Sequence, residues 1–416
     1  MTDIEQRLRR DLKEVTERVA PGSIRPLREP MVRRRARVVR CLAPVAAVVA
    51  VIGVVAGASL VSRSHGGQSA DVPSNSVPEP VGPMPRYYVT AYQSFVGEAA
   101  AHVVTYAAVH DSATGKLLAR VTVPTLTDAQ GGTEGPSITA AGDDRTFVIT
   151  EQSDQPKVVK FYLLRVAANG RSARLSALPL TVPGYLSAQD VALSPDGTRL
   201  AMDVQHCNKS TCPYTGIRVV TIAAGTASTW VTRANGAPFN VSWAGNEHMA
   251  FEWQSNVNNP PAGQQTGYRL LSLTGPGRNL MASRAIGSPQ AEPSQYVPAA
   301  LVTPDGNLVI TSTVQNISHF FGLRHTVVSR IVELSAGTGQ LVRILHTVTQ
   351  SGVASGANGV GKADQSCNVL SLGPAGVHVL VACPGFGRLD GRRFTALPGF
   401  PSSSSSGISG QQAAAW

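Results

Sequence analysis

The sequence has few charged residues and lacks the compact motifs that identify common enzyme and metal sites. Charged residues make up 15% of the chain and hydrophobic residues 43%, a composition that supports a sizeable core. The nine histidines form no H-E-x-x-H motif, no close pair and no zinc-type spacing with cysteine. No G-x-S-x-G elbow occurs either. We therefore predict no catalytic residue, no metal ligand and no cofactor.

One stretch matches a phosphate-binding loop only in part. Residues 356–363 read G-x-x-x-x-G-K-A, so Ala363 stands where a P-loop has the Ser or Thr that binds Mg²⁺. The residues that follow, 367–372, have the composition of a strand, whereas a P-loop requires a helix N-terminus facing the phosphates. We expect a loop between two structural units here.

The positive charge is concentrated near the N-terminus. The formal net charge is +10, and residues 1–40 contribute +6 of it, whereas the much longer stretch 63–416 contributes only +4. A nucleic-acid-binding protein would need a basic face on its main domain, and the sequence shows none. We predict no nucleic-acid partner.

An uncharged apolar run, 41–62, lies between Arg40 and Arg63. A helix of this length spans roughly 33 Å, enough for a hydrocarbon core of about 30 Å. Five arginines precede the run within ten residues, so the positive-inside rule places 1–40 in the cytoplasm and 63–416 outside. We expect a single-pass protein of the cell membrane with an extracytoplasmic main domain.

Two further readings of this run stay open. Ala56-Gly57-Ala58 resembles a signal-peptidase site, so a cleaved signal peptide is the alternative, although the run and its basic flank are both long for one. Gly53 and Gly57 form a G-x-x-x-G pair, which lets two membrane helices approach closely and is compatible with a dimer.

The segments on either side of the run have distinct patterns. Apolar residues recur every three or four positions near the N-terminus, which predicts an amphipathic helix that either docks on a partner protein or is merely solvated. This stripe consists of Ile4, Leu8, Leu12, Val15 and Val19. Residues 63–86 contain five prolines and are expected to form an extended linker.

Residues 87–400 repeat one unit that consists of two β-hairpins. The first hairpin turns at Ser/Thr-Pro-Asp-Gly or a variant of it, because Asp and Gly tolerate the backbone of tight turns. These turns lie 49 to 70 residues apart. The clearest turn residues are Asp143, Asp196, Gly197, Asp305 and Gly306.

Four strands per unit predict the blades of a β-propeller, with six units visible and a seventh conceivable in 346–366. A pair of β-sandwiches is the alternative. The turns resemble those of the WD-repeat-like propeller superfamily in its bacterial, membrane-anchored form, over about three quarters of the chain, although the Trp-Asp dipeptides are missing. The resemblance implies an all-β propeller without implying one function. The serine-rich segment 401–416 is expected to be a disordered tail.

The four cysteines outside the apolar run suggest two disulfides. Cys367 and Cys383 each lie eight residues from an expected turn at Ala375, so they would face each other in a hairpin. Cys207 and Cys212 enclose a four-residue loop. We predict both bridges because disulfides persist outside the cell; free thiols are the alternative.

The fold and the missing motifs lead us to expect a non-enzymatic scaffold that binds a protein or ligand on the propeller. One alternative is a transmembrane signalling protein that uses residues 1–20 on a cytoplasmic partner. Its layout is similar to that of membrane-tethered anti-sigma regulators, but their zinc-binding H-x-x-x-C-x-x-C motif is absent. A second alternative is an extracytoplasmic hydrolase or lyase, which would need acids and histidines converging at one channel mouth.

Overall fold

The computed structural model describes residues 82–96, 102–126, 135–154, 157–180, 191–206, 214–256, 267–274, 278–286, 295–296, 300–319, 324–353, 367–383, 385–397 and 413–416. These belong to one compact unit, Val77–Trp416. The predicted N-terminal helix, the apolar run 41–62 and the Cys207–Cys212 pair lie outside the described residues. Within those ranges, no helix has the length and apolar character needed to cross a membrane.

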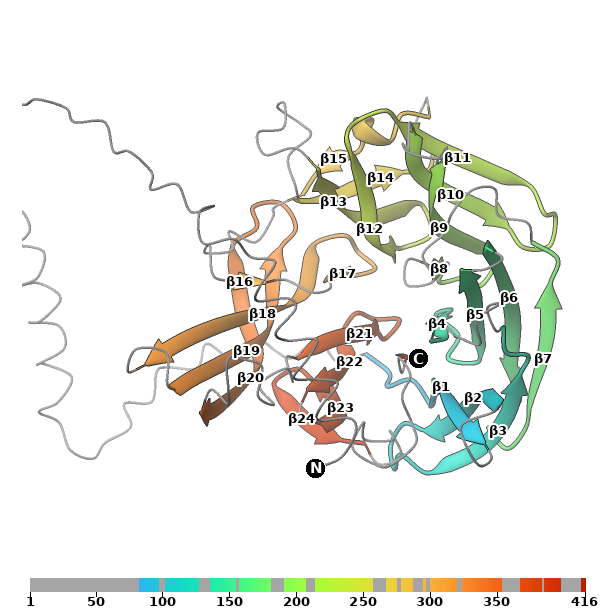
Figure 1. The fold of residues 1–416 in the computed structure, drawn as a ribbon, viewed down its shortest axis with the longest axis horizontal. Coiled ribbons are helices and arrows are strands. Elements are labelled where there is room, and N and C mark those ends of the chain that lie inside the picture. Colours follow the sequence, from blue (N-terminus) through green and yellow to red (C-terminus); the bar gives the residue numbers. More distant parts are fainter. Residues whose placement is uncertain are drawn as a thin grey trace, which may run out of the picture. The chain divides into compact units, whose positions relative to one another are not determined.

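The described chain folds into six antiparallel sheets, the six blades of a β-propeller (Figure 1). Given from the inner to the outer strand, blade 1 consists of β25 (Ala413–Ala415), β1 (Tyr87–Val96), β2 (His102–Asp111) and β3 (Leu117–Val123). Blade 2 consists of β4 (Ser137–Ala140), β5 (Thr146–Asp154), β6 (Lys157–Val166) and β7 (Ala173–Leu178). Blade 3 consists of β8 (Val191–Leu193), β9 (Arg199–His206), β10 (Tyr214–Thr221) and β11 (Ala227–Thr232).

The remaining three blades follow the same plan. Blade 4 consists of β12 (Gly236–Ala244), β13 (His248–Ser255), β14 (Gly267–Ser272) and β15 (Arg284–Ala285), with a 3₁₀ turn η2 (Leu280–Ala282) before β15. Blade 5 has two short inner strands, β16 (Gln295–Tyr296) and β17 (Ala300–Val302), followed by β18 (Leu308–His319), β19 (Arg324–Ser335) and β20 (Leu341–Val353). Blade 6 consists of β21 (Asn368–Leu372), β22 (His378–Cys383), β23 (Gly385–Asp390) and β24 (Arg393–Ala396).

The inner strands contact one another in the order β25, β4, β8, β12, β17 and β21, and β21 contacts β25 again, which closes the ring.

The expectation of a tail at 401–416 was wrong for its last residues. Ala413–Ala415 pair with Val89–Ala91 of β1, and Trp416 is 2% exposed. The chain therefore closes its first blade with its last strand. The ring of inner strands contains six blades, and residues 346–353 of the proposed seventh, 346–366, belong to β20.

The Pro-Asp-Gly turns join the first two strands of their blades. In blade 3 the carboxylate of Asp196 accepts hydrogen bonds from the Ser194 hydroxyl at 2.5 Å and the Thr198 amide at 3.0 Å. Asp305 repeats this arrangement in blade 5. Gly197 and Gly306 take φ values of 69° and 73°, a left-handed conformation that glycine adopts without strain. These local bonds explain why the motif marks the blades in the sequence.

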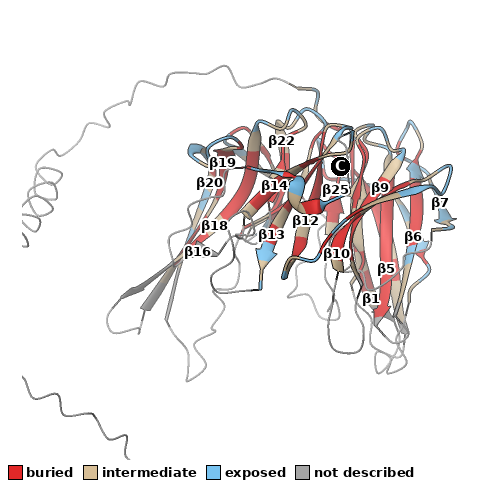
Figure 2. Ribbon diagram, turned by 90° about the horizontal axis from the view of Figure 1, so that it is seen from above, coloured by how far each residue is buried: buried red, intermediate tan, exposed pale blue. Residues whose placement is uncertain are grey.

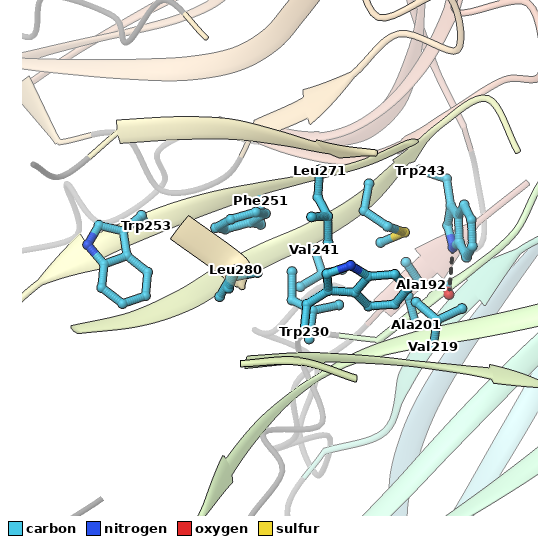
Figure 3. Close-up of a cluster of buried hydrophobic side chains, with 12 residues drawn as sticks. Ala192, Ala201, Val219, Trp230, Val241, Trp243, Phe251, Trp253, Leu271 and Leu280 are labelled. Carbon is cyan, nitrogen blue, oxygen red and sulfur yellow. Dashed lines mark hydrogen bonds between the residues drawn. The ribbon is translucent and has the colours of Figure 1, made fainter. Parts of the chain in front are cut away.

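The core consists of layers between neighbouring blades, and burial is greatest on the middle strands (Figure 2). Alternate residues of a strand face opposite neighbours, so each blade contributes to two layers. The layer between blades 3 and 4 contains three of the four tryptophans of the chain, Trp230, Trp243 and Trp253 (Figure 3).

The predicted bridge between Cys367 and Cys383 is present in blade 6. Their Cα atoms are 4.0 Å apart, and the residues next to them, Asn368 and Ala382, are paired across β21 and β22. The hairpin register therefore brings the two cysteines together, as their equal distance from the turn indicates.

Candidate functional site: the central cavity

The inner strands of all six blades surround a cavity of about 570 Å³. This volume lies within the roughly 300–1,000 Å³ of typical ligand sites. Partly exposed apolar side chains from four blades line it, namely Ile138, Val191, Leu301 and Leu370. A ligand that fills the cavity would meet every blade at once.

No described residue that lines this cavity has an ionisable side chain. The polar side chains on its wall are hydroxyls and amides, among them Ser137, Thr139, Asn240 and Asn368. A charged ligand would lose its hydration without gaining a charged side chain of the described wall as a partner, which costs several kcal/mol or more. The wall therefore favours an uncharged ligand.

Hydrogen bonds between neighbouring blades hold the rim of the cavity. The amide of Gly142 in blade 2 donates to the carbonyl of Pro195 in blade 3 at 2.8 Å. The indole Nε1 of Trp243 in blade 4 donates to the carbonyl of Ala192 in blade 3 at 2.9 Å (Figure 3). The guanidinium of Arg199 lies over the Trp243 ring, 4.9 Å from its centroid. These contacts make the rim a preformed structure.

Asn240 adds a fixed polar group to the wall. It lies in a β-bulge between Phe239 and Ser242 and has a φ of 52°. Its Nδ2 donates to Oε2 of Glu252 on β13 at 2.7 Å, and Nε2 of Gln254 donates to Oε1 of the same carboxylate at 3.2 Å. Burial raises the pKa of Glu252, while the two amide donors act against that rise.

A second buried acid, Glu151, lies away from the cavity lining, between blades 1 and 2. It is 0% exposed, and its Oε2 accepts a hydrogen bond from the Leu126 amide at 3.4 Å. Burial raises the pKa of Glu151 to about 7, although a hydrogen bond from Thr105 opposes the shift. Its Oε1 is buried without a hydrogen-bond partner in the described part of the chain. Its place in the core favours a role in stability.

Among the described residues, His378 and Asp390 form the one His–Asp pair of the kind that catalytic triads use, and here the pair has a structural role. Nδ1 of His378 lies 2.7 Å from Oδ1 of Asp390, and Arg388 Nε donates to the other carboxylate oxygen at 2.8 Å. The second ring nitrogen, Nε2, lies 3.1 Å from the carbonyl of Gly82. That contact occupies the nitrogen that a nucleophile would need, and it attaches the segment before β1 to blade 6.

The residues singled out from the sequence do not form one site. Asp196 and Asp305 form blade turns, and Asp143 makes the corresponding contacts to Arg145 and Thr146 in blade 2. The apolar stripe from Ile4 to Val19 lies outside the described residues. Sequence reasoning missed Asn240, because its role depends on a bulge and on a glutamate from the neighbouring strand.

Comparison with known proteins gives likenesses of fold only. No family model matches the sequence, and no curated protein matches it. A prolyl endopeptidase structure is 16% identical, over 64% of this chain and 36% of that chain, with a TM-score of 0.33. The β-propeller domain of the Trilobed protease from Pyrococcus furiosus is 8% identical, over 63% and 70%, with a TM-score of 0.30. Acylaminoacyl peptidase from Pyrococcus horikoshii is 9% identical, over 76% and 51%, with a TM-score of 0.38.

These matches correct two expectations. The neighbours are propellers of peptidases, so the prediction of a non-enzymatic scaffold and the prediction that the protein is not an enzyme are contradicted and withdrawn. Both predictions depended on missing linear motifs. A propeller assembles its sites from short segments of all six blades, and such a site leaves no compact motif. The match covers only about a third of the prolyl endopeptidase chain and about half of the acylaminoacyl peptidase chain, and the likenesses assign this chain no activity.

Proposed function

We propose that the central cavity binds a short, uncharged, largely apolar peptide, and that the propeller is the substrate-selecting part of a peptide-hydrolysing protein. The observation that carries the proposal is the 570 Å³ cavity, along which the described residues place no ionisable side chain. The prolyl endopeptidase and acylaminoacyl peptidase neighbours act on peptides, which is the same substrate class. The proposal assigns substrate binding, and no bond-breaking step, to the described residues.

The inner strands suit a peptide better than a compact apolar molecule. Each inner strand stands at the end of its sheet, so in the described structure one edge of it has no strand partner. Peptides bind such edges through backbone hydrogen bonds, with alternate side chains directed to either side. The apolar side chains of Ile138, Val191 and Leu301 provide the surface for them.

The test measures peptide binding to the full chain by isothermal titration calorimetry. The probe is an N-acetylated, C-amidated tetrapeptide of alanine and valine, compared with versions in which one residue is lysine or aspartate. We expect the charged versions to bind at least tenfold more weakly, because the wall offers them no partner. Equal binding of charged and neutral peptides would refute the proposal.

A matched pair of variants locates the binding. Ser137 lines the cavity, whereas Ser228 lies on β11, the outer strand of blade 3, and both are partly exposed. Ser137→Lys brings a charge into the cavity and is expected to weaken binding at least tenfold, while Ser228→Lys leaves it unchanged. If the two variants bind alike, the peptide binds elsewhere.

The location of the protein is a separate proposal. The uncharged run 41–62, with arginines only on its N-terminal flank apart from Arg63, supports a single-pass anchor with the propeller outside the cytoplasm. A tag at the C-terminus that is digested by protease in intact spheroplasts would agree with this orientation. Protection of that tag until the membrane is broken would contradict it.

A further inference from the structure

A second pocket, of about 690 Å³, lies on the outer side of blade 3, where β11 contacts the η2 turn of blade 4 (Figure 1). Its wall consists of the start of β10, the end of β11 with the residues that follow it, and the η2 turn. The amide of Val231 donates to the carbonyl of Arg278 at 2.9 Å and joins the two blades here. This pocket and the central cavity share no described lining residue.

The pocket contains a cation that has no acidic partner among the described residues. Nη2 of Arg233 donates to the hydroxyl oxygen of Tyr214 at 2.8 Å, and the guanidinium lies over the Tyr214 ring, 5.0 Å from its centroid. Both residues line the pocket, and Arg233 is exposed. Within the described ranges, no Asp or Glu forms an ion pair with Arg233. The tyrosine therefore fixes the guanidinium at the wall and uses one of its five N–H groups in doing so.

The sequence around the pocket carries no negative side chain. Residues 204–246 and 253–291 contain no Asp and no Glu, whereas each stretch contains three Lys or Arg residues. These two stretches supply every residue of β10, β11, β14, η2 and β15. An anion that reaches this pocket therefore meets an attractive local field, because none of these elements repels it.

The remaining side chains of the wall suit an organic anion better than an inorganic one. Val231 is 40% exposed, and Met281 is partly exposed, so the wall has an apolar part. Asn235 and Asn279 add exposed amide side chains. The planar guanidinium matches the geometry of a carboxylate, and one cation balances its single charge, whereas a phosphate carries between one and two charges at neutral pH.

We infer that this pocket binds a small ligand that combines one carboxylate with an apolar body, such as an acylated amino acid, and that Arg233 binds the carboxylate. The inference does not depend on the proposed function, because it concerns a separate pocket. The two pockets have opposite preferences: the wall of the central cavity disfavours a charged ligand, and the outer pocket requires one.

The experiment compares two ligands that differ only in charge. N-acetylvaline and its carboxamide, N-acetylvalinamide, are titrated with the full chain at low ionic strength, and binding is followed by ligand-observed NMR. We expect the carboxamide to bind at least tenfold more weakly, because it loses the charge-assisted hydrogen bonds to Arg233. Equal binding of the two ligands would overturn the inference.

Inorganic phosphate serves as a third probe in the same measurement. It offers an anion without an apolar body, so it should bind more weakly than N-acetylvaline. Phosphate that binds as tightly as N-acetylvaline would show that the apolar part of the wall adds nothing, and would overturn the ligand class proposed here.

A matched pair of arginine variants locates the binding. Arg233→Gln removes the cation of the pocket and should weaken the binding of N-acetylvaline at least tenfold. Arg120 on β3 is also exposed and lies over a tyrosine ring, 4.9 Å from the centroid of Tyr106, but it is not part of the pocket. Arg120→Gln removes the same charge from the same kind of stack and should leave binding unchanged. Equal losses in both variants would assign the effect to net charge and overturn the inference.

A further variant keeps the test decisive if Arg233→Gln fails to fold. Val231→Glu changes an exposed side chain of the same wall and places a carboxylate within the pocket, where it competes for the guanidinium. It should weaken the binding of N-acetylvaline at least tenfold. A Val231→Glu variant that binds N-acetylvaline as the wild type does would overturn the inference without reference to Arg233→Gln.

Discussion

Two layers between blades show opposite solutions to the same packing problem. The layer between blades 3 and 4 is apolar throughout its cluster and contains Trp230, Trp243 and Trp253. The layer between blades 1 and 2 begins in the same way, with Phe147 and Ile149, but continues along the same face of β5 to the buried Glu151. Blades of one repeat therefore need not contribute to stability in the same way. We expect the first layer to be insensitive to pH and the second to depend on it.

The largest expected effect comes from the apolar layer. Trp253 is 0% exposed and packs in the cluster with Phe251 and Leu280. Trp253→Ala should lower the free energy of unfolding by about 3–5 kcal/mol, through lost apolar burial and the cavity that remains. Urea unfolding of the full chain measures this. The control is Val231→Ala on β11, where the side chain is 40% exposed and the change should stay within about 0.5 kcal/mol. Similar losses for both variants would show that the layer is not the centre of stability that its packing indicates.

The second prediction concerns pH and the layer between blades 1 and 2. Burial raises the pKa of Glu151 from 4.5 to about 7, so between these values the folded protein binds this proton more tightly than the unfolded chain does. The resulting stabilisation is fully present below about pH 4.5 and is lost as the pH rises through 7. Between pH 5 and pH 8 the free energy of unfolding should fall by about 2–3 kcal/mol on account of this group.

Glu151→Gln tests this prediction directly. The variant keeps the shape of the side chain and has no proton to lose, so its stability should change less between pH 5 and pH 8 than that of the wild type. Glu247, an exposed residue in the turn between β12 and β13, provides the control, since Glu247→Gln should leave the pH dependence intact. A Glu151→Gln profile that parallels the wild type would mean that other groups cause the pH dependence.

Only some features of this fold and its candidate site could be predicted from the sequence. The Pro-Asp-Gly turns and the pairing of Cys367 with Cys383 were predictable because they depend on residues close in the sequence. Strand β25 was not, because three alanines after a serine-rich segment have no strand signal of their own and are held by pairing with β1. Glu151 and Asn240 were missed for a related reason: their roles depend on neighbours in another blade or strand, and no local pattern records them.

The smallest predicted effect concerns two threonines beside Glu151, in the layer between blades 1 and 2. The Thr125 hydroxyl donates to the Thr105 hydroxyl at 3.0 Å and accepts from the Thr105 amide at 2.8 Å, and Thr105 in turn hydrogen bonds to Glu151. Thr125→Val removes the first two bonds and keeps the shape, so it should cost about 1 kcal/mol. Because Thr125 does not titrate and Thr105 keeps its bond to the carboxyl group, the loss should be equal at pH 5 and pH 8 in urea unfolding. A loss confined to pH 8 would show instead that the threonine pair stabilises the ionised form of Glu151, and that the two hydroxyls and the acid act as one unit.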